Sequence, residues 1–147
     1  MTAKTKAQRA SDLPEDEGMD MSKFFQVFTE YMALSDHYLS HAPHHIRHTL
    51  VNRIQNTELD ILGHAVECQH HYRYRASALT ALNKAHERLR YLWLLYYNRG
   101  FFGYNKGRKG EQERRPGTSE HRLTAISRFV DTLGRLIGVQ LRHLSRA

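Results

Sequence analysis

Cysteine is almost absent from this sequence, because Cys68 is the single one among 147 residues. An internal disulfide is therefore excluded, which agrees with a reducing cytoplasm. Long uncharged apolar runs are also missing, and the mean hydropathy of -0.66 argues against a membrane-spanning helix. The first residues hold no apolar stretch of the kind that a secretory signal needs. These absences predict a soluble cytoplasmic protein without membrane contact.

Proline is scarce as well, and it never interrupts a periodic segment. Pro14, Pro43 and Pro116 stand between such segments, where a residue without a backbone N–H disturbs helices least. No alternating apolar run predicts a strand. The sequence also lacks a nucleophile elbow, a phosphate-binding loop and a dinucleotide fingerprint. It therefore favours an all-α protein without catalytic activity and without a cofactor.

Apolar residues recur at three- and four-residue steps in four segments, which predicts four amphipathic helices over 21–39, 50–68, 78–96 and 123–144. Short connections between the first three imply an antiparallel up-down four-helix bundle over 21–147, after a lead over 1–20 that we expect to be disordered. The second helix is predicted to bury Leu50, Val51, Ile54, Ile61, Leu62, Ala65 and Cys68. The third is predicted to bury Ala78, Leu79, Leu82, Ala85, Leu89, Leu92, Trp93 and Tyr96.

Histidine is abundant, and five histidines crowd the turn between the first two helices: His37, His41, His44, His45 and His48. Their i, i+4 pairs straddle a proline, and no acidic or thiolate complement lies nearby, so a metal site is disfavoured. The pattern Glu67-x-x-His70 occurs once, whereas di-iron bundles use that element twice. We expect no bound metal.

The charge points to a polyanionic partner, since the net charge is +7 and 16 of the 22 basic residues are arginine. A guanidinium group can donate two parallel hydrogen bonds to one phosphate. The alternative is a basic surface that only aids solubility. The residues predicted to bind nucleic acid are Arg73, Arg75, Lys84, Arg88, Arg99, Lys106, Arg108, Lys109, Arg114, Arg115, Arg128, Arg135 and Arg142.

A long connection over 100–117 interleaves Phe101, Phe102 and Tyr104 with several of these cations. Aromatic rings beside cations can stack on bases while phosphates are neutralised, which makes this basic loop the leading candidate for nucleic-acid contact. The alternative is an ordinary loop whose aromatic side chains fold back onto the bundle.

The last predicted helix contains two glycines, Gly134 and Gly138, although each costs about 1 kcal/mol relative to alanine. On a helical wheel they lie between the apolar stripe and the outward row of Arg128, Arg135 and Arg142. We expect a neighbouring helix, from this chain or another copy, to approach there. Tyr91, Leu94 and Leu95 lie opposite the core face of the third helix, which also favours self-association.

Three stretches carry a resemblance to a known family: "APHHIRHTLVNRIQNTELDIL", "ALTALNKAHERLRYLWLL" and the final "LGRLIGVQL", whose Gly-Arg-x-apolar-Gly pattern is the most specific. With the basic composition, they make residues 24–144 similar to a family of four-helix bundles. This family includes the accessory variability determinant (Avd) of diversity-generating retroelements, and proteins encoded in intervening sequences of ribosomal RNA genes. The chain departs from the family at Gln140 and Leu141, where an aromatic residue is usual, and in the length of the 100–117 connection.

The resemblance implies a homopentameric barrel of four-helix bundles, encoded by a bacterium or phage. Its Avd branch implies a non-catalytic protein that binds a reverse transcriptase, template-repeat RNA and cDNA, largely independently of sequence, and supports mutagenic retrohoming. Its ribosomal branch implies general nucleic-acid binding in an unassigned role. A stand-alone metal-binding or enzymatic bundle is a third interpretation, from a different class.

Overall fold

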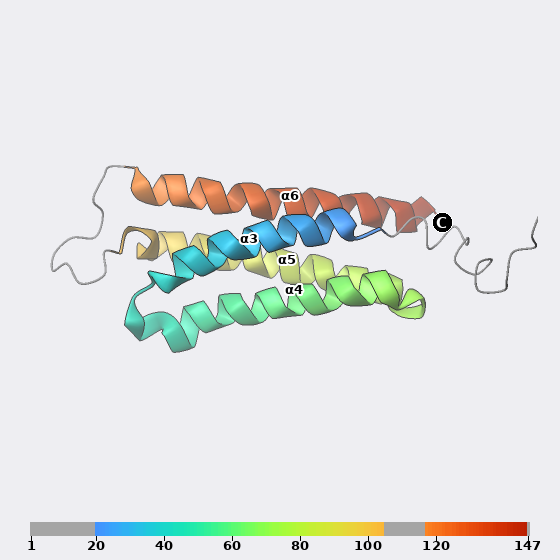
Figure 1. Ribbon diagram of the computed structural model, residues 1–147, viewed down its shortest axis with the longest axis horizontal. Helices are drawn as coiled ribbons and strands as arrows, with labels where there is room; N and C mark the ends of the chain where they lie inside the picture. The colour runs from blue at the N-terminus through green and yellow to red at the C-terminus, as the bar shows by residue number, and fades with distance from the viewer. Residues whose placement is uncertain (1–19, 105–116, 147) are drawn as a thin grey trace, which may run out of the picture.

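A computed structural model describes residues 20–104 and 117–146, and within these ranges the chain is all helical with no strand. Its four long helices are α3 (Ser22–Ser40), α4 (Asn52–His70), α5 (Arg75–Asn98) and α6 (Thr118–Arg146). Each runs opposite to the one before it, and together they form an elongated four-helix bundle (Figure 1). The predicted all-α four-helix architecture is confirmed.

Among the described residues, four short helical turns lie outside the long helices. η1 (His44–Ile46) and a π-helical turn, η2 (Arg47–Val51), follow the break at Pro43 and lead directly into α4. η3 (Tyr72–Tyr74) joins α4 to α5. After α5, Gly100 adopts a positive φ of 79°, which only glycine takes without strain, and η4 (Phe101–Gly103) follows.

The core is dense in aromatic side chains near η4. Phe102 is buried and stacks on Trp93 at a centroid distance of 5.6 Å, while Tyr38 and Tyr96 meet its ring edge-on. Phe101 is half-buried and packs against Tyr96. The expectation of base stacking is therefore wrong for Phe102, which is buried, whereas Phe101 folds back onto the bundle but stays partly exposed. Burying such rings stabilises the fold more than leaving them exposed in a loop.

A polar network crosses this core between α3, α4 and α5. Tyr31 and Ser35 each donate a hydrogen bond of 2.6 Å to Glu58 Oε2, and Trp93 Nε1 donates to the Tyr31 hydroxyl at 2.9 Å. Glu58 is only 1% exposed, and its Oε1 atom has no hydrogen-bond partner. Burial raises the pKa of this carboxyl from 4.5 to about 6, although the two donors oppose that shift.

Most predicted core positions are buried, but Leu62 is 40% exposed and its assignment to the core is wrong. On a wheel of 100° per residue it lies about 80° from Ile54, at the shoulder of the buried face. Leu50 and Leu92 are half-buried rather than enclosed. Both line the groove described next.

Candidate nucleic-acid interface

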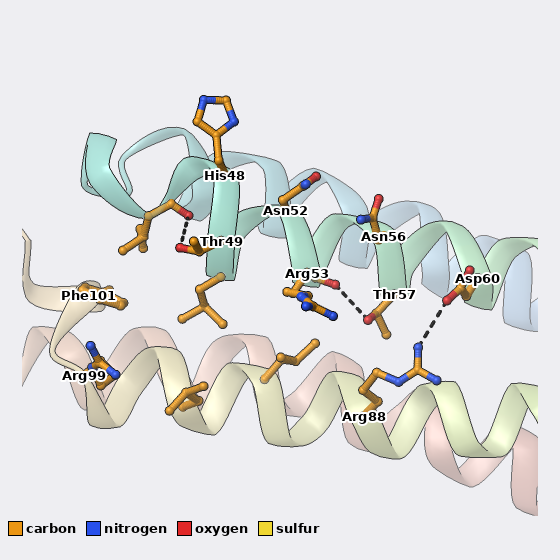
Figure 2. Close-up of a pocket in the computed structure, with 14 residues that line it drawn as sticks. His48, Thr49, Asn52, Arg53, Asn56, Thr57, Asp60, Arg88, Arg99 and Phe101 are labelled. Atoms are coloured by element: carbon orange, nitrogen blue, oxygen red, sulfur yellow. Dashed lines mark hydrogen bonds and ion pairs between the residues drawn. The ribbon is translucent and has the colours of Figure 1, made fainter.

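A groove of about 960 Å³ lies between the beginning of α4 and the end of α5. Two antiparallel helices in contact form its walls, and η2 and η4 border it (Figure 2). The π-helical turn η2 carries His48, Thr49 and Leu50 into this lining, with the Thr49 hydroxyl donating to the Ile46 carbonyl at 3.3 Å. The groove thus combines residues from segments about 40 positions apart.

Three exposed arginines line the groove: Arg53 on α4, Arg88 on α5, and Arg99 directly after α5. Asp60 is the only carboxylate in the lining, and it lies 3.2 Å from Arg88 Nη1. Because both side chains are more than half exposed, water screens this pair and a phosphate can compete for the guanidinium. The groove therefore has an excess of positive charge.

Polar and apolar side chains share the remaining lining. Asn52 and Asn56 stand on the α4 wall near His48, pointing away from α5 in Figure 2. Leu92 and Leu95 on α5, with Leu50 and Phe101, form an apolar floor. We call Leu50, Leu92, Leu95 and Phe101 the groove floor. Such a lining can contact an anionic ligand that also has apolar surface.

Two residues predicted to bind nucleic acid, Arg88 and Arg99, line this groove, together with Leu95, which was predicted at an interface between copies. Arg73 and Lys84 are exposed but lie outside its lining. Arg75 is only 5% exposed, and its Nε donates to the Cys68 carbonyl at 3.0 Å. Its assignment to the nucleic-acid surface is therefore wrong: it satisfies one of the last carbonyls of α4, which have no partner within the helix.

The predicted outward row on α6 is exposed at all three positions, Arg128, Arg135 and Arg142. Arg135 also donates to the hydroxyl of Thr132 one turn earlier, at 3.1 Å. The predicted residues Lys106, Arg108, Lys109, Arg114 and Arg115 lie outside the described residues, as does the lead up to residue 19.

The two glycines of α6 have different surroundings. A Cβ built on Gly134 would lie 2.8 Å from His86 Cε1, so the side chain of α5 fills this notch within one chain. His86 Nε2 donates to the Val130 carbonyl at 2.7 Å, which fixes the ring, and burial lowers the pKa of His86. A Cβ on Gly138 would meet only Arg142 Nη1, at 3.7 Å. Both glycines line a groove between α5 and α6, but His86 of the same chain fills the notch at Gly134, while the notch at Gly138 is open.

The other residues predicted at an interface between copies are exposed: Tyr91 by 70%, Leu94 by 38% and Leu95 by 43%. Sequence reasoning missed a second apolar stripe on α4. Leu59, Leu62 and Val66 lie at i, i+3 and i+7 and are all exposed. Tyr74 and Val139 are exposed large apolar residues as well.

Arg53 is the main groove residue that sequence reasoning did not assign to the site. It follows the π-helical turn, one turn before Thr57, whose hydroxyl donates to the Arg53 carbonyl at 2.8 Å. A signal was present, because Arg53 belongs to the stretch that carries the family resemblance. Its role depends on α5 lying beside it, which periodicity does not reveal.

No family model, curated protein or solved structure matches this chain. The groove and the arginine row are therefore interpreted from their own chemistry.

Within residues 20–104 and 117–146, no group of three or more His, Cys, Asp or Glu side chains is placed to hold a metal ion. Burial raises the pKa of the Cys68 thiol to about 11, so it stays protonated at neutral pH. None of the described helices is long and apolar enough to cross a membrane.

Proposed function

We propose that this chain is a non-catalytic accessory protein of a diversity-generating retroelement that binds template RNA and cDNA through its basic surfaces. The observation that carries the proposal is the groove between α4 and α5, whose lining holds three arginines, Arg53, Arg88 and Arg99, and a single carboxylate, that of Asp60. The exposed row of Arg128 and its heptad neighbours on α6 adds a second basic surface. Guanidinium groups contact phosphates without reading bases, so binding is largely independent of sequence.

Two parts of this proposal, the reverse transcriptase as partner and the fivefold assembly, are based on the family resemblance. Exposed apolar side chains on two helices, Tyr91 and Leu94 on α5 and Leu59 on α4, support self-association, since a soluble chain rarely leaves such surface uncovered. We propose a homopentamer that presents five copies of the basic surfaces to one polymerase and its template.

Binding of a labelled RNA at several salt concentrations tests the nucleic-acid component. Each neutralised phosphate contributes roughly -0.7 to -0.9 to the slope of log affinity against log salt. We expect a steep slope in the parent and a shallower one when Arg128, Arg135 and Arg142 become glutamine, with helicity unchanged. No binding at low salt would refute the proposal.

Light scattering coupled to size exclusion tests the assembly, with an expected mass about five times 17.2 kDa. A monomer at micromolar concentration would refute self-association. Coexpression with a candidate reverse transcriptase from the same genome tests the remaining component: we expect the polymerase and RNA to copurify with this protein. If neither copurifies while free RNA still binds, the protein binds nucleic acid in another role.

A further inference from the structure

The groove floor is a feature that phosphate binding alone does not require. Leu92, Leu95 and Phe101 line the groove together with the arginines, and Leu95 is 43% exposed. Leu92 and Leu95 fall between Arg88 and Arg99 along α5, and Figure 2 shows Phe101 beside Arg99 at one end of the groove and Arg88 toward the other. A ligand that fills the groove must therefore carry both apolar surface and negative charge.

The spacing of the cations limits the size of this ligand. Arg88 and Arg99 are about 16 Å apart along the axis of α5, at 1.5 Å per residue. Arg53 stands on the opposite wall, on α4. The groove volume of about 960 Å³ lies within the range of sites that enclose a ligand of a few ring systems. A ligand that contacts all three arginines therefore carries several anionic groups, spread over about 16 Å.

We propose that this groove binds unpaired nucleotides of a single nucleic-acid strand, with bases against the groove floor and phosphates on Arg53, Arg88 and Arg99. Unpaired bases expose the flat apolar faces that the floor can cover, whereas a duplex hides these faces in its stack. A duplex would contact the arginines and leave the floor exposed. The inference rests on the proposed nucleic-acid binding and narrows it to one surface and one ligand class.

The excess of positive charge argues against an uncharged ligand, since Asp60 is the only carboxylate in the lining. An acidic protein segment with apolar side chains could also pair with the three arginines and cover the groove floor. It would not require bases, so an oligonucleotide without bases separates the two occupants.

The first test compares three ligands of equal phosphate number at one salt concentration, by fluorescence anisotropy. They are a single-stranded RNA of twelve nucleotides, the same strand with abasic positions, and a blunt RNA hairpin. We expect the single strand to bind at least fivefold more tightly than the other two. Equal affinities would overturn the groove inference while leaving the proposed function intact. Failure of all three to bind would overturn the proposed function itself.

The second test places a carboxylate on the groove floor. Leu95→Glu should weaken binding of the single strand about tenfold and remove most of its advantage over the hairpin. Leu94→Glu is the matched control: it adds the same charge at a neighbouring residue of similar exposure that does not line the groove. Both residues are also candidates for contact between copies, so light scattering must show that the two variants have the same mass.

Equal weakening by Leu94→Glu and Leu95→Glu would overturn the inference, because only general charge would then matter. A Leu95→Glu variant that keeps the affinity for the single strand and loses the reverse transcriptase would also overturn it, in favour of a protein occupant. Photocrosslinking of the parent protein to a 4-thiouridine strand gives an independent check. The crosslinks should fall within residues 46–60 or 88–101, and crosslinks only on α6 would place the strand elsewhere.

Discussion

The imidazole of His86 occupies the space that a side chain at Gly134 would need. An added Cβ there would lie 2.8 Å from His86 Cε1 and 3.1 Å from Nε2. The ring cannot move aside without losing its hydrogen bond to the Val130 carbonyl. This contact explains one glycine of α6 by packing within a single subunit.

Gly134→Ala and Gly138→Ala should therefore change stability in opposite directions. At Gly134 the methyl group overpacks the site, at a cost of about 1 to 3 kcal/mol, of which about 1 is recovered from helix propensity. At Gly138 the nearest atom is 3.7 Å away, so the propensity gain of about 1 kcal/mol should remain. Urea denaturation measures both changes.

The double variant His86→Ala with Gly134→Ala is the control for this pair. Removing the ring should make alanine at residue 134 neutral or stabilising relative to His86→Ala alone. A Gly134→Ala protein more stable than the parent would contradict the packing account. If Gly138→Ala instead reduces the mass of an oligomer, another copy approaches at Gly138.

The buried carboxyl of Glu58 should make stability depend on pH. Burial raises its pKa to about 6, so the folded protein holds this proton over a range in which the unfolded chain, with a pKa near 4.5, has released it. The resulting stabilisation is complete below pH 4.5 and is lost as pH rises to about 6. Above that pH the free energy of unfolding is lower by roughly 2 kcal/mol. Glu58→Gln should abolish this slope.

The measurement is the free energy of unfolding of parent and variant between pH 4 and 8, taken as a difference. His86, whose pKa burial lowers, acts in the opposite sense, losing stability as pH falls, and it cancels because both proteins contain it. Glu67→Gln, at an exposed position of the same helix, is the matched control for removing a carboxyl. If the difference in the free energy of unfolding between the parent and Glu58→Gln stays constant from pH 4 to 8, the raised pKa of Glu58 is contradicted.

Arg75 should matter for folding rather than for nucleic-acid binding. Arg75→Ala leaves the Cys68 carbonyl without its buried donor and removes packed methylene groups, which should cost about 1 to 3 kcal/mol. The salt dependence of RNA binding should not change. Arg73→Ala, two residues earlier and exposed, should leave the melting temperature near that of the parent. The reverse pattern, a stable Arg75→Ala protein with weakened RNA binding, would restore its predicted surface role.

Periodicity predicted the helices well because the core imposes it directly. In α6, Ile126, Val130, Leu133 and Ile137 are at most 2% exposed, as a stripe at helical spacing requires. Leu62 was misassigned because a residue at the edge of such a stripe is buried only if the next helix packs closely there. Sequence alone does not give that distance.

Glu58 and Arg53 were missed for different physical reasons. A glutamate in a helix is ordinarily a surface residue, yet Glu58 lies four residues after Ile54 and three before Ile61, on the buried face. Its spacing from these two isoleucines therefore predicts burial from the sequence alone. Arg53 gains its place only through the neighbouring α5, so its role requires the tertiary arrangement.

The π-helical turn over Arg47–Val51 fixes the number of residues that the chain needs between Pro43 and α4, beside the groove. Its wider ring accommodates about one more residue than an α-helical turn. Removing one residue would let the turn close as α-helix and rotate everything before it by about 100° relative to α4. His48 would then no longer line the groove, and η1 would lose the packing of its buried Ile46 against the bundle. This segment should therefore accept many substitutions at its exposed positions and yet reject a single-residue deletion.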